Sequence, residues 1–138
     1  MNTINKENIE HFIDAAKNSL ISTIDEEGYP ATRAMLEVRV REGLNKLYFS
    51  TNTSSNKVKE IRKNSKGSVY FFDPQKYIGC LLKGHFDVAT DTETKKKIWR
   101  EGDTLYYPKG IADEDFCVLI FTIDKGRVYS DFTSENFS

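Results

Sequence analysis

Hydroxyl and amide side chains fill residues 51–57, which read Thr-Asn-Thr-Ser-Ser-Asn-Lys. The run follows a strand-like segment, 46–51, and leads into segment 54–64, where Val58 and Ile61 have helical spacing. Free N–H groups and the dipole at a helix start favour an anion, and Lys57 adds a positive charge. Because Ser, Thr and Asn are also the usual capping residues, the run predicts either a cap or a phosphate site. A lysine in the first turn favours phosphate, since the dipole alone would select an acid there.

Arg33 is a second candidate cation for the same anion. Residues 31–41 alternate strictly, with apolar side chains at even positions and charged ones on the face that carries Arg33. We expect segments 19–24, 31–41 and 46–51 to form an antiparallel meander, which places Arg33 beside both neighbouring strands. Its guanidinium can then reach the anion from the sheet, or it is solvated like Arg39 and Arg41.

Other chemistry has little support in the sequence. Phosphate-loop, dinucleotide, zinc-protease and nucleophile-elbow motifs are absent, no side chain qualifies as a general acid or base, and no metal site is expected. We interpret His11 as a surface residue and His85 as a strand residue at the barrel surface or the edge of a pocket. Cys80 and Cys117 each lie in apolar runs, without zinc-ligand spacing, and we expect both to be reduced and buried.

The order of elements predicts a mainly β fold. Residues 9–16 show a helical apolar face, with Asn5 or Thr3 as its cap, and residues 91–100 predict another helix. Strands are predicted at 19–24, 31–41, 46–51, 67–73, 77–89, 116–124 and 127–132, with the last two joined by a turn at Lys125-Gly126. Short strands joined by tight turns favour an antiparallel barrel with peripheral helices over a parallel sheet.

Composition restricts the class of protein. The chain has 138 residues, 38% of them hydrophobic, which suits a single domain spanning residues 1–138. Twenty Lys and Arg balance 21 Asp and Glu, so we expect no nucleic-acid partner. No apolar run has the length of a signal peptide or a membrane span, and we expect a soluble, cytoplasmic protein with no membrane partner.

The segment 116–123 is apolar on both faces of the predicted strand. A strand of a small barrel normally shows one face to solvent, so something must cover the second face. A second copy of the chain is the simplest cover, which predicts a homodimer.

Two stretches resemble the FMN-binding split β-barrel family of pyridoxamine 5'-phosphate oxidase-like proteins. Residues 28–35 look like the family's second strand, and residues 49–57 are similar to its phosphate segment. Trp99, residues 107–110 and residues 113–115 resemble a stretch of the general stress protein 26-like branch. The resemblance covers nearly the whole chain after the first helix and implies an antiparallel Greek-key split barrel.

The resemblance also implies a cofactor site. Arg33, Ser50, Thr51, Asn56 and Lys57 would contact the phosphate and ribityl groups of FMN, with Met35 near the flavin ring. Gly79 falls where the oxidases carry a glutamine near the ring, and Trp99 either packs on the barrel or lies near the flavin. The full set of implied cofactor-binding residues is Arg33, Ala34, Met35, Ser50, Thr51, Ser55, Asn56, Lys57, Gly79 and Trp99.

The implied function is an FMN-binding flavoprotein, an oxidoreductase acting on a small molecule, and a homodimer with FMN near the subunit interface. Asn56 stands where the oxidases usually carry an arginine, and the sequence ends without their C-terminal Arg-x-His segment. We therefore do not expect oxidation of pyridoxamine 5'-phosphate itself. A non-catalytic stress protein that binds a flavin or another phosphorylated ligand, and a split barrel that uses F420 or haem, remain as alternatives.

Overall fold

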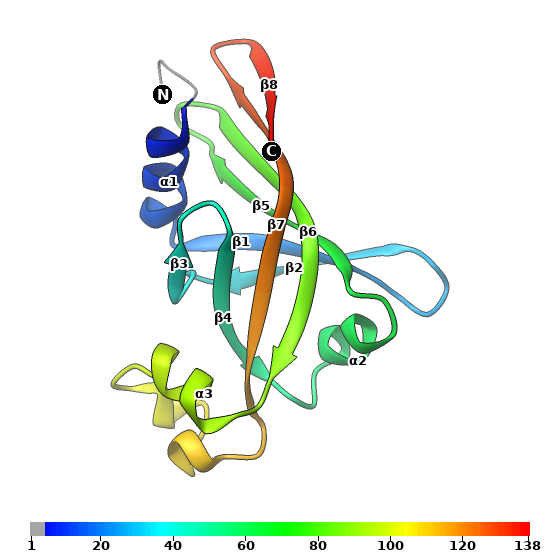
Figure 1. Ribbon diagram of the computed structural model, residues 1–138, viewed down its shortest axis with the longest axis vertical. Helices are drawn as coiled ribbons and strands as arrows, with labels where there is room; N and C mark the ends of the chain where they lie inside the picture. The colour runs from blue at the N-terminus through cyan, green and yellow to red at the C-terminus, as the bar shows by residue number, and fades with distance from the viewer. Residues whose placement is uncertain (1–4) are drawn as a thin grey trace.

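The computed structural model describes residues 5–138 as one sharply curved antiparallel sheet with three α-helices around it (Figure 1). The described strands are β1 (Asn18–Ile24), β2 (Pro30–Leu36), β3 (Val40–Glu42), β4 (Lys46–Asn52), β5 (Lys66–Asp73), β6 (Ile78–Ala89), β7 (Phe116–Ser130) and β8 (Thr133–Phe137). The helices are α1 (Lys6–Ala15), α2 (Asn56–Lys63) and α3 (Thr92–Ile98), with short 3-10 helices η1 (Asp103–Leu105) and η2 (Gly110–Ala112). The predicted mainly β class with peripheral helices is confirmed.

The strand order is β2-β1-β5-β6-β7-β4-β3, with β8 paired to β7, so β2 and β3 form the two ends of the sheet. Figure 1 shows β1 and β2 running across the long strands β4, β6 and β7. The predicted meander holds in part: β1 pairs with β2, and residues 40–42, as β3, pair with β4. It is wrong for residues 30–36, because β2 does not pair with β4, which pairs with β7 instead. The sheet is split between β2 and β4, and this gap positions the candidate site.

The alternation over residues 31–41 does not form one strand. It breaks after Leu36 and resumes at Val40, and Arg39 between them is buried rather than solvated. The Arg39 guanidinium pairs with the Asp103 carboxylate at 2.7 Å and also donates to the carbonyl oxygen of Ile98. The backbone N–H of Arg39 still donates to the carbonyl oxygen of Tyr48, on β4, at 2.8 Å, so the break lies between Leu36 and Arg39. Neither this break nor the ion pair with a residue 64 positions away can be read from alternation.

The predicted turn at Lys125-Gly126 is also wrong, because β7 is continuous through both residues. Gly126 is buried, and a Cβ there would overlap the ring of Phe137, so the glycine permits close packing rather than a turn. The chain reverses instead at Asp131 and Phe132, which both have positive φ angles, at 52° and 63°.

The helices agree well with the sequence. The Asn5 side chain caps α1 by accepting from the backbone N–H of Asn8, and the alternative cap, Thr3, lies outside the described residues. Segments 54–64 and 91–100 become α2 and α3, each slightly shorter than predicted. Within residues 5–138, no helix has both the length and the apolar character that crossing a membrane requires.

Both faces of the N-terminal half of β7 are covered within the chain itself. One face joins the main core, where Cys117, Leu119 and Phe121 are fully buried. The other face carries Phe116 and Val118, which form a second cluster with Tyr48, Ile98 and Tyr107. Because α3 and the segment that follows it supply the cover, this strand gives no support for a second copy of the chain.

Candidate functional site

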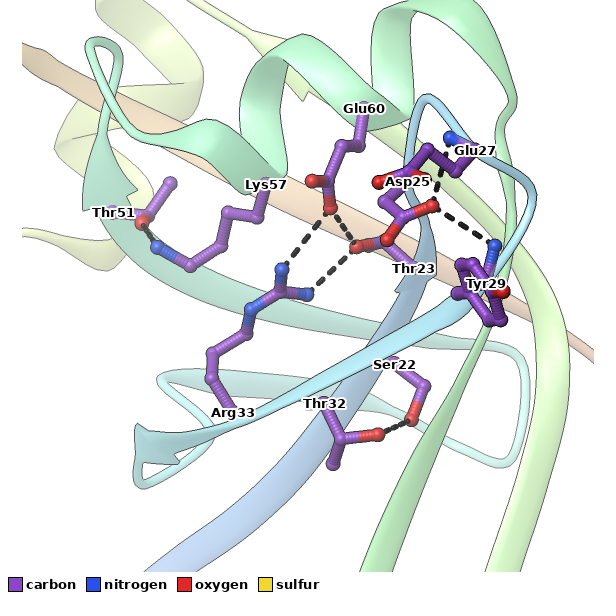
Figure 2. A network of polar contacts seen from close by, with 10 residues as sticks. All are labelled: Ser22, Thr23, Asp25, Glu27, Tyr29, Thr32, Arg33, Thr51, Lys57 and Glu60. Carbon is purple, nitrogen blue, oxygen red and sulfur yellow. Dashed lines mark hydrogen bonds and ion pairs between the residues drawn. The ribbon is translucent and has the colours of Figure 1, made fainter.

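Arg33 lies on β2 and is held by two groups from neighbouring elements (Figure 2). Its Nη1 donates to Oγ1 of Thr23, on β1, at 2.7 Å, and its Nη2 donates to Oε1 of Glu60, on α2, at 3.1 Å. The Thr23 hydroxyl in turn donates to the same Glu60 oxygen at 2.6 Å. Arg33 is thus not a freely solvated strand-face arginine, since three groups form a closed hydrogen-bonded ring.

Lys57 lies in the first turn of α2, and its Nζ donates to Oγ1 of Thr51, on β4, at 2.8 Å. Burial lowers the pKa of Lys57, and the positive charge of the nearby Arg33 lowers it further. The two cations therefore lie close enough to repel one another. Arg33 pairs with the Glu60 carboxylate, whereas the hydrogen bond from Lys57 goes to a neutral hydroxyl, which leaves the positive charge of Lys57 available to an anion.

The loop between β4 and α2 uses its polar groups to hold its own turn. The backbone N–H groups of Thr53 and Ser54 donate to Asp115, as does the Asn52 side chain. The Asn52 bond, with those from Ser54, holds the pKa of the Asp115 carboxyl below its ordinary value. The amides at 53 and 54 are therefore engaged within the protein, and the anion would depend mainly on side chains.

Side-chain capping does not account for the run of hydroxyl residues. Ser55 is the N-cap of α2, but its side chain makes no capping hydrogen bond. Its hydroxyl instead donates to the carbonyl oxygen of Asn52 at 2.8 Å. The sequence allowed either a helix cap or a phosphate site for this run, and the geometry disfavours the side-chain cap.

A pocket of about 240 Å³ lies where the sheet is split, between β2 and β4. Its walls come from both strands, from the start of α2, and from one residue of the segment between α3 and β7. The lining residues are Ala34, Met35, Leu36, Glu37, Phe49, Ser50, Thr51, Asn52, Lys57 and Tyr106. The outer edge of β2 is not paired in the sheet order, so its backbone groups can bind a ligand here.

Five of the ten predicted residues line this pocket, namely Ala34, Met35, Ser50, Thr51 and Lys57. Arg33 is not among the lining residues, but its charge acts on Lys57. Asn56 lines a separate groove of about 610 Å³ between α2 and the turn that joins β1 to β2.

Gly79 and Trp99 lie elsewhere in the chain. Gly79 lies on β6, where it pairs with Phe72 of β5 and Tyr129 of β7. A Cβ on Gly79 would overlap the Tyr70 hydroxyl. Trp99 packs edge-on against Phe116, with ring centroids 5.3 Å apart, as the packing interpretation predicts. Neither residue joins the pocket within one copy of the chain.

Among the residues of this region that the sequence prediction missed, Thr23 and Glu60 contact Arg33. Tyr106 lines the pocket, as do Leu36, Glu37, Phe49 and Asn52. Glu60 follows Lys57 by three positions on α2, a helical spacing that places both on one side of the helix and that was visible in the sequence. Thr23 is fully buried on β1, and Tyr106 lies 55% exposed beside the pocket. Nothing in the sequence pattern connects these two residues with Arg33 or Lys57.

The remaining reactive side chains have structural surroundings. Cys80 and Cys117 are free and buried, and burial raises the pKa of the Cys80 thiol to about 12, so neither is an activated nucleophile. His85 Nδ1 lies 2.7 Å from the Asp124 carboxylate on the surface of the barrel. Across residues 5–138, no group of three His, Cys, Asp or Glu side chains is arranged to hold a metal ion.

Comparison with known proteins identifies the family. A sequence profile described as "Pyridoxamine 5'-phosphate oxidase like" matches residues 5–137. A Clostridium acetobutylicum protein related to general stress protein 26, of the pyridoxinephosphate oxidase family, is 33% identical, with a TM-score of 0.88 over 98% of this chain and 96% of that one. No curated protein sequence matches the chain significantly.

More distant structures share the fold. General stress protein 26 from Bacillus anthracis is 19% identical, with a TM-score of 0.78 over 96% of this chain and 98% of that one. A heme binding protein from Mycobacterium smegmatis is 12% identical, with a TM-score of 0.79 over all of this chain and 59% of that one. With its profile match, its architecture and a 33% identical relative along nearly its full length, the chain belongs to the pyridoxamine 5'-phosphate oxidase-like family of split barrels.

Proposed function

We propose that the chain binds FMN, with the phosphate beside Arg33 and Lys57 and the flavin ring against the open edge of β2. The observation that carries this proposal is that Arg33, on β2, and Lys57, on α2, lie close together next to the pocket between β2 and β4. The polar run at residues 51–57 and the alternating strand that carries Arg33 indicate the same two residues in the sequence.

The electrostatics favour a phosphorylated ligand. A half-buried lysine whose pKa is lowered by burial and by Arg33 is in surroundings short of negative charge. A phosphate group would supply that charge and accept hydrogen bonds from both cations. The Thr51 hydroxyl, which accepts a hydrogen bond from Lys57, lies beside the same cation and can donate to a phosphate oxygen.

The walls of the pocket suit the rest of a flavin. Ala34, Met35 and Leu36 offer apolar surface on β2, and Tyr106 offers an aromatic ring on the opposite segment. The unpaired edge of β2 offers backbone donors and acceptors for the polar rim of the ring. When bound, FMN supplies hydride or electron transfer, and the chain's own residues bind and orient it. A small-molecule redox partner completes the proposed oxidoreductase.

We also propose that the functional unit is a homodimer. A pocket of about 240 Å³ is smaller than the roughly 300–1,000 Å³ of most ligand sites, as expected of a site completed by a second copy. An aromatic face formed by Tyr70, Phe72, Tyr77 and Tyr129 lies open on the sheet, with Phe72 45% and Tyr77 64% exposed. Such a connected apolar patch is typical of an interface.

The position of Gly79 also bears on the proposed dimer. It pairs with both Phe72 and Tyr129, so it belongs to the region of the aromatic face. Within one copy it does not line the pocket. For Gly79 to lie near a flavin, as the resemblance implies, a second copy must bring its aromatic face beside the pocket of the first copy.

The test of FMN binding is a titration of the purified protein followed by flavin fluorescence and visible absorption. The double variant Arg33→Ala with Lys57→Ala should weaken FMN binding by about 100-fold or more, because each charged hydrogen bond contributes about 1.5–3 kcal/mol. The matched control is Lys59→Ala with Arg62→Ala, which removes the same two charges from exposed positions of α2. Equal loss in both variants, or in neither, would refute the phosphate site.

Reduction of the bound flavin separates an enzyme from a carrier. A flavoprotein oxidoreductase should accept electrons from a nicotinamide nucleotide or another small donor over repeated turnovers. A protein that binds FMN tightly but leaves it oxidised with each such donor would fit the storage or sensing alternative.

A further inference from the structure

Arg33, to which we assign the ligand phosphate, already pairs with a carboxylate of its own chain. The Glu60 carboxylate receives hydrogen bonds from Arg33 and from Thr23 through one oxygen, Oε1. The side chains of Arg33 and Glu60 are 26% and 14% exposed, so the pair is largely shielded from water. Figure 2 shows the guanidinium directed at Glu60 and Thr23, with Lys57 to one side directed at Thr51.

This pairing leaves part of the guanidinium available. An arginine has five N–H donors, and the bonds to Thr23 and Glu60 use two of them. An incoming phosphate must therefore either share Arg33 with Glu60 or displace the carboxylate from it. In both cases a dianion comes close to a fixed negative charge, which opposes binding.

We propose that Glu60 is an internal counter-anion that competes with the ligand phosphate for Arg33 and so limits the affinity of the site for phosphorylated ligands. This inference rests on the proposed function. Glu60 is a positioning residue in this scheme, because it acts on the ligand through Arg33. Glu60 keeps the partly shielded guanidinium paired when no ligand is bound, and it lowers the affinity for a phosphate that approaches Arg33.

The variant Glu60→Gln separates charge from geometry. The Gln amide oxygen can still accept hydrogen bonds from Thr23 and Arg33, while the negative charge is gone. Removing one like charge from this shielded site should tighten FMN binding about 5- to 20-fold. If Glu60 only held Arg33 in place, the same change would weaken binding or leave it unchanged.

The measurement compares the dissociation constants of FMN and riboflavin, which share the ring and differ in the phosphate. Glu60→Gln should lower the value for FMN and leave the value for riboflavin unchanged, a difference that general loosening of the fold cannot produce. Glu27→Gln is the control, because it removes the same charge from an exposed residue of the β1–β2 turn and should change neither value more than twofold. Glu60→Ala, a second charge-free variant, should also bind FMN more tightly if Glu60→Gln does not fold.

Inorganic phosphate distinguishes failure of this inference from failure of the proposed function. If wild-type protein binds neither flavin, but phosphate raises the melting temperature of Glu60→Gln at lower concentrations than it does for wild type, the FMN proposal fails and the counter-anion role stands. If FMN binds wild type and Glu60→Gln equally, or binds the variant more weakly, the counter-anion role is overturned and FMN binding stands. If neither flavin nor phosphate distinguishes the two proteins, the counter-anion role is also overturned.

Discussion

The ammonium group of Lys57 donates a hydrogen bond of 2.8 Å to the hydroxyl of Thr51, which joins the first turn of α2 to β4. Both residues line the pocket between β2 and β4. The bond fixes a cation at the side of this pocket, although burial makes the charged form of Lys57 costly. Lys57 is therefore placed for binding an anion at some expense of stability.

That expense should appear in the pH dependence of unfolding. The folded-state pKa of Lys57 lies below the ordinary value of 10.5, so in the window just below 10.5 the unfolded chain binds more protons. The free energy of unfolding must then rise with pH across this window and lose that increment at lower pH. Relative to Lys57→Met, wild type should gain stability as the pH rises toward 10.5, as measured by urea denaturation. A constant or opposite difference would contradict the buried charge.

The buried Arg39–Asp103 pair should stabilise the segment that carries Tyr106. Asp103→Asn leaves the Arg39 charge without its partner and should lower the free energy of unfolding by about 3 kcal/mol, whereas Glu101→Gln, at an exposed position, should cost less than about 0.5 kcal/mol. Denaturant titration measures both. Equal small effects would show that the ion pair contributes little.

The stabilisation that the Asp103 carboxylate provides should also depend on pH. Burial alone would raise the pKa of Asp103, but hydrogen bonds from Arg39 and from the Arg100 backbone outweigh burial and hold it below 3.8. The stability due to this carboxylate should be lost only as pH falls below 3.8, through its folded pKa. The difference in the free energy of unfolding between wild type and Asp103→Asn should therefore become smaller below pH 3.8.

Tyr106 should contribute to FMN binding through its ring. Tyr106→Ala removes an aromatic wall of the pocket and should raise the FMN dissociation constant about 5- to 10-fold. Leu105→Ala is the control, because Leu105 is the adjacent residue, is 81% exposed and does not line the pocket. Fluorescence titration measures the FMN dissociation constant of both variants. An equal change in this constant for the two variants would exclude a specific role for Tyr106.

The aromatic face should be the dimer interface. Phe72→Glu places a charge among Tyr70, Tyr77 and Tyr129 and should shift the protein from dimer to monomer in sedimentation velocity. Leu105→Glu is the matched control, since Leu105 is 81% exposed in η1, a segment that contributes no residue to this face. A wild-type protein that is monomeric at all concentrations, or a dimer that Phe72→Glu leaves intact, would exclude this interface.

Local patterns predicted the elements of this fold well, because apolar spacing and capping residues act over a few positions. The Asn5 cap, the helices after residues 55 and 91, and most strands follow from such patterns. Strand pairing does not, since alternation in residues 31–41 says nothing about which strand lies alongside. Arg39 gives an example: it is buried against Asp103, 64 residues away, and no local pattern shows that contact.

The sequence predicted the two cations of the candidate site, but it predicted fewer of the residues that surround them. Arg33 and Lys57 were identified together, and the structure places them near one another. Glu60 was missed because a glutamate on a polar helix face is ordinary, and only its contact with Arg33 makes it distinctive. Gly126 was misjudged as a turn because sequence cannot distinguish a glycine that turns the chain from one that admits a neighbouring ring.

The most direct test of the phosphate site compares FMN with riboflavin on wild type and on the Arg33→Ala, Lys57→Ala double variant. Isothermal titration should show wild type preferring FMN by about 100-fold or more, because only FMN carries the phosphate for these two cations. In the double variant the preference should fall to within a few-fold, with riboflavin affinity nearly unchanged. Equal wild-type affinity for the two flavins, or a preference that survives in the double variant, would contradict a phosphate site at Arg33 and Lys57.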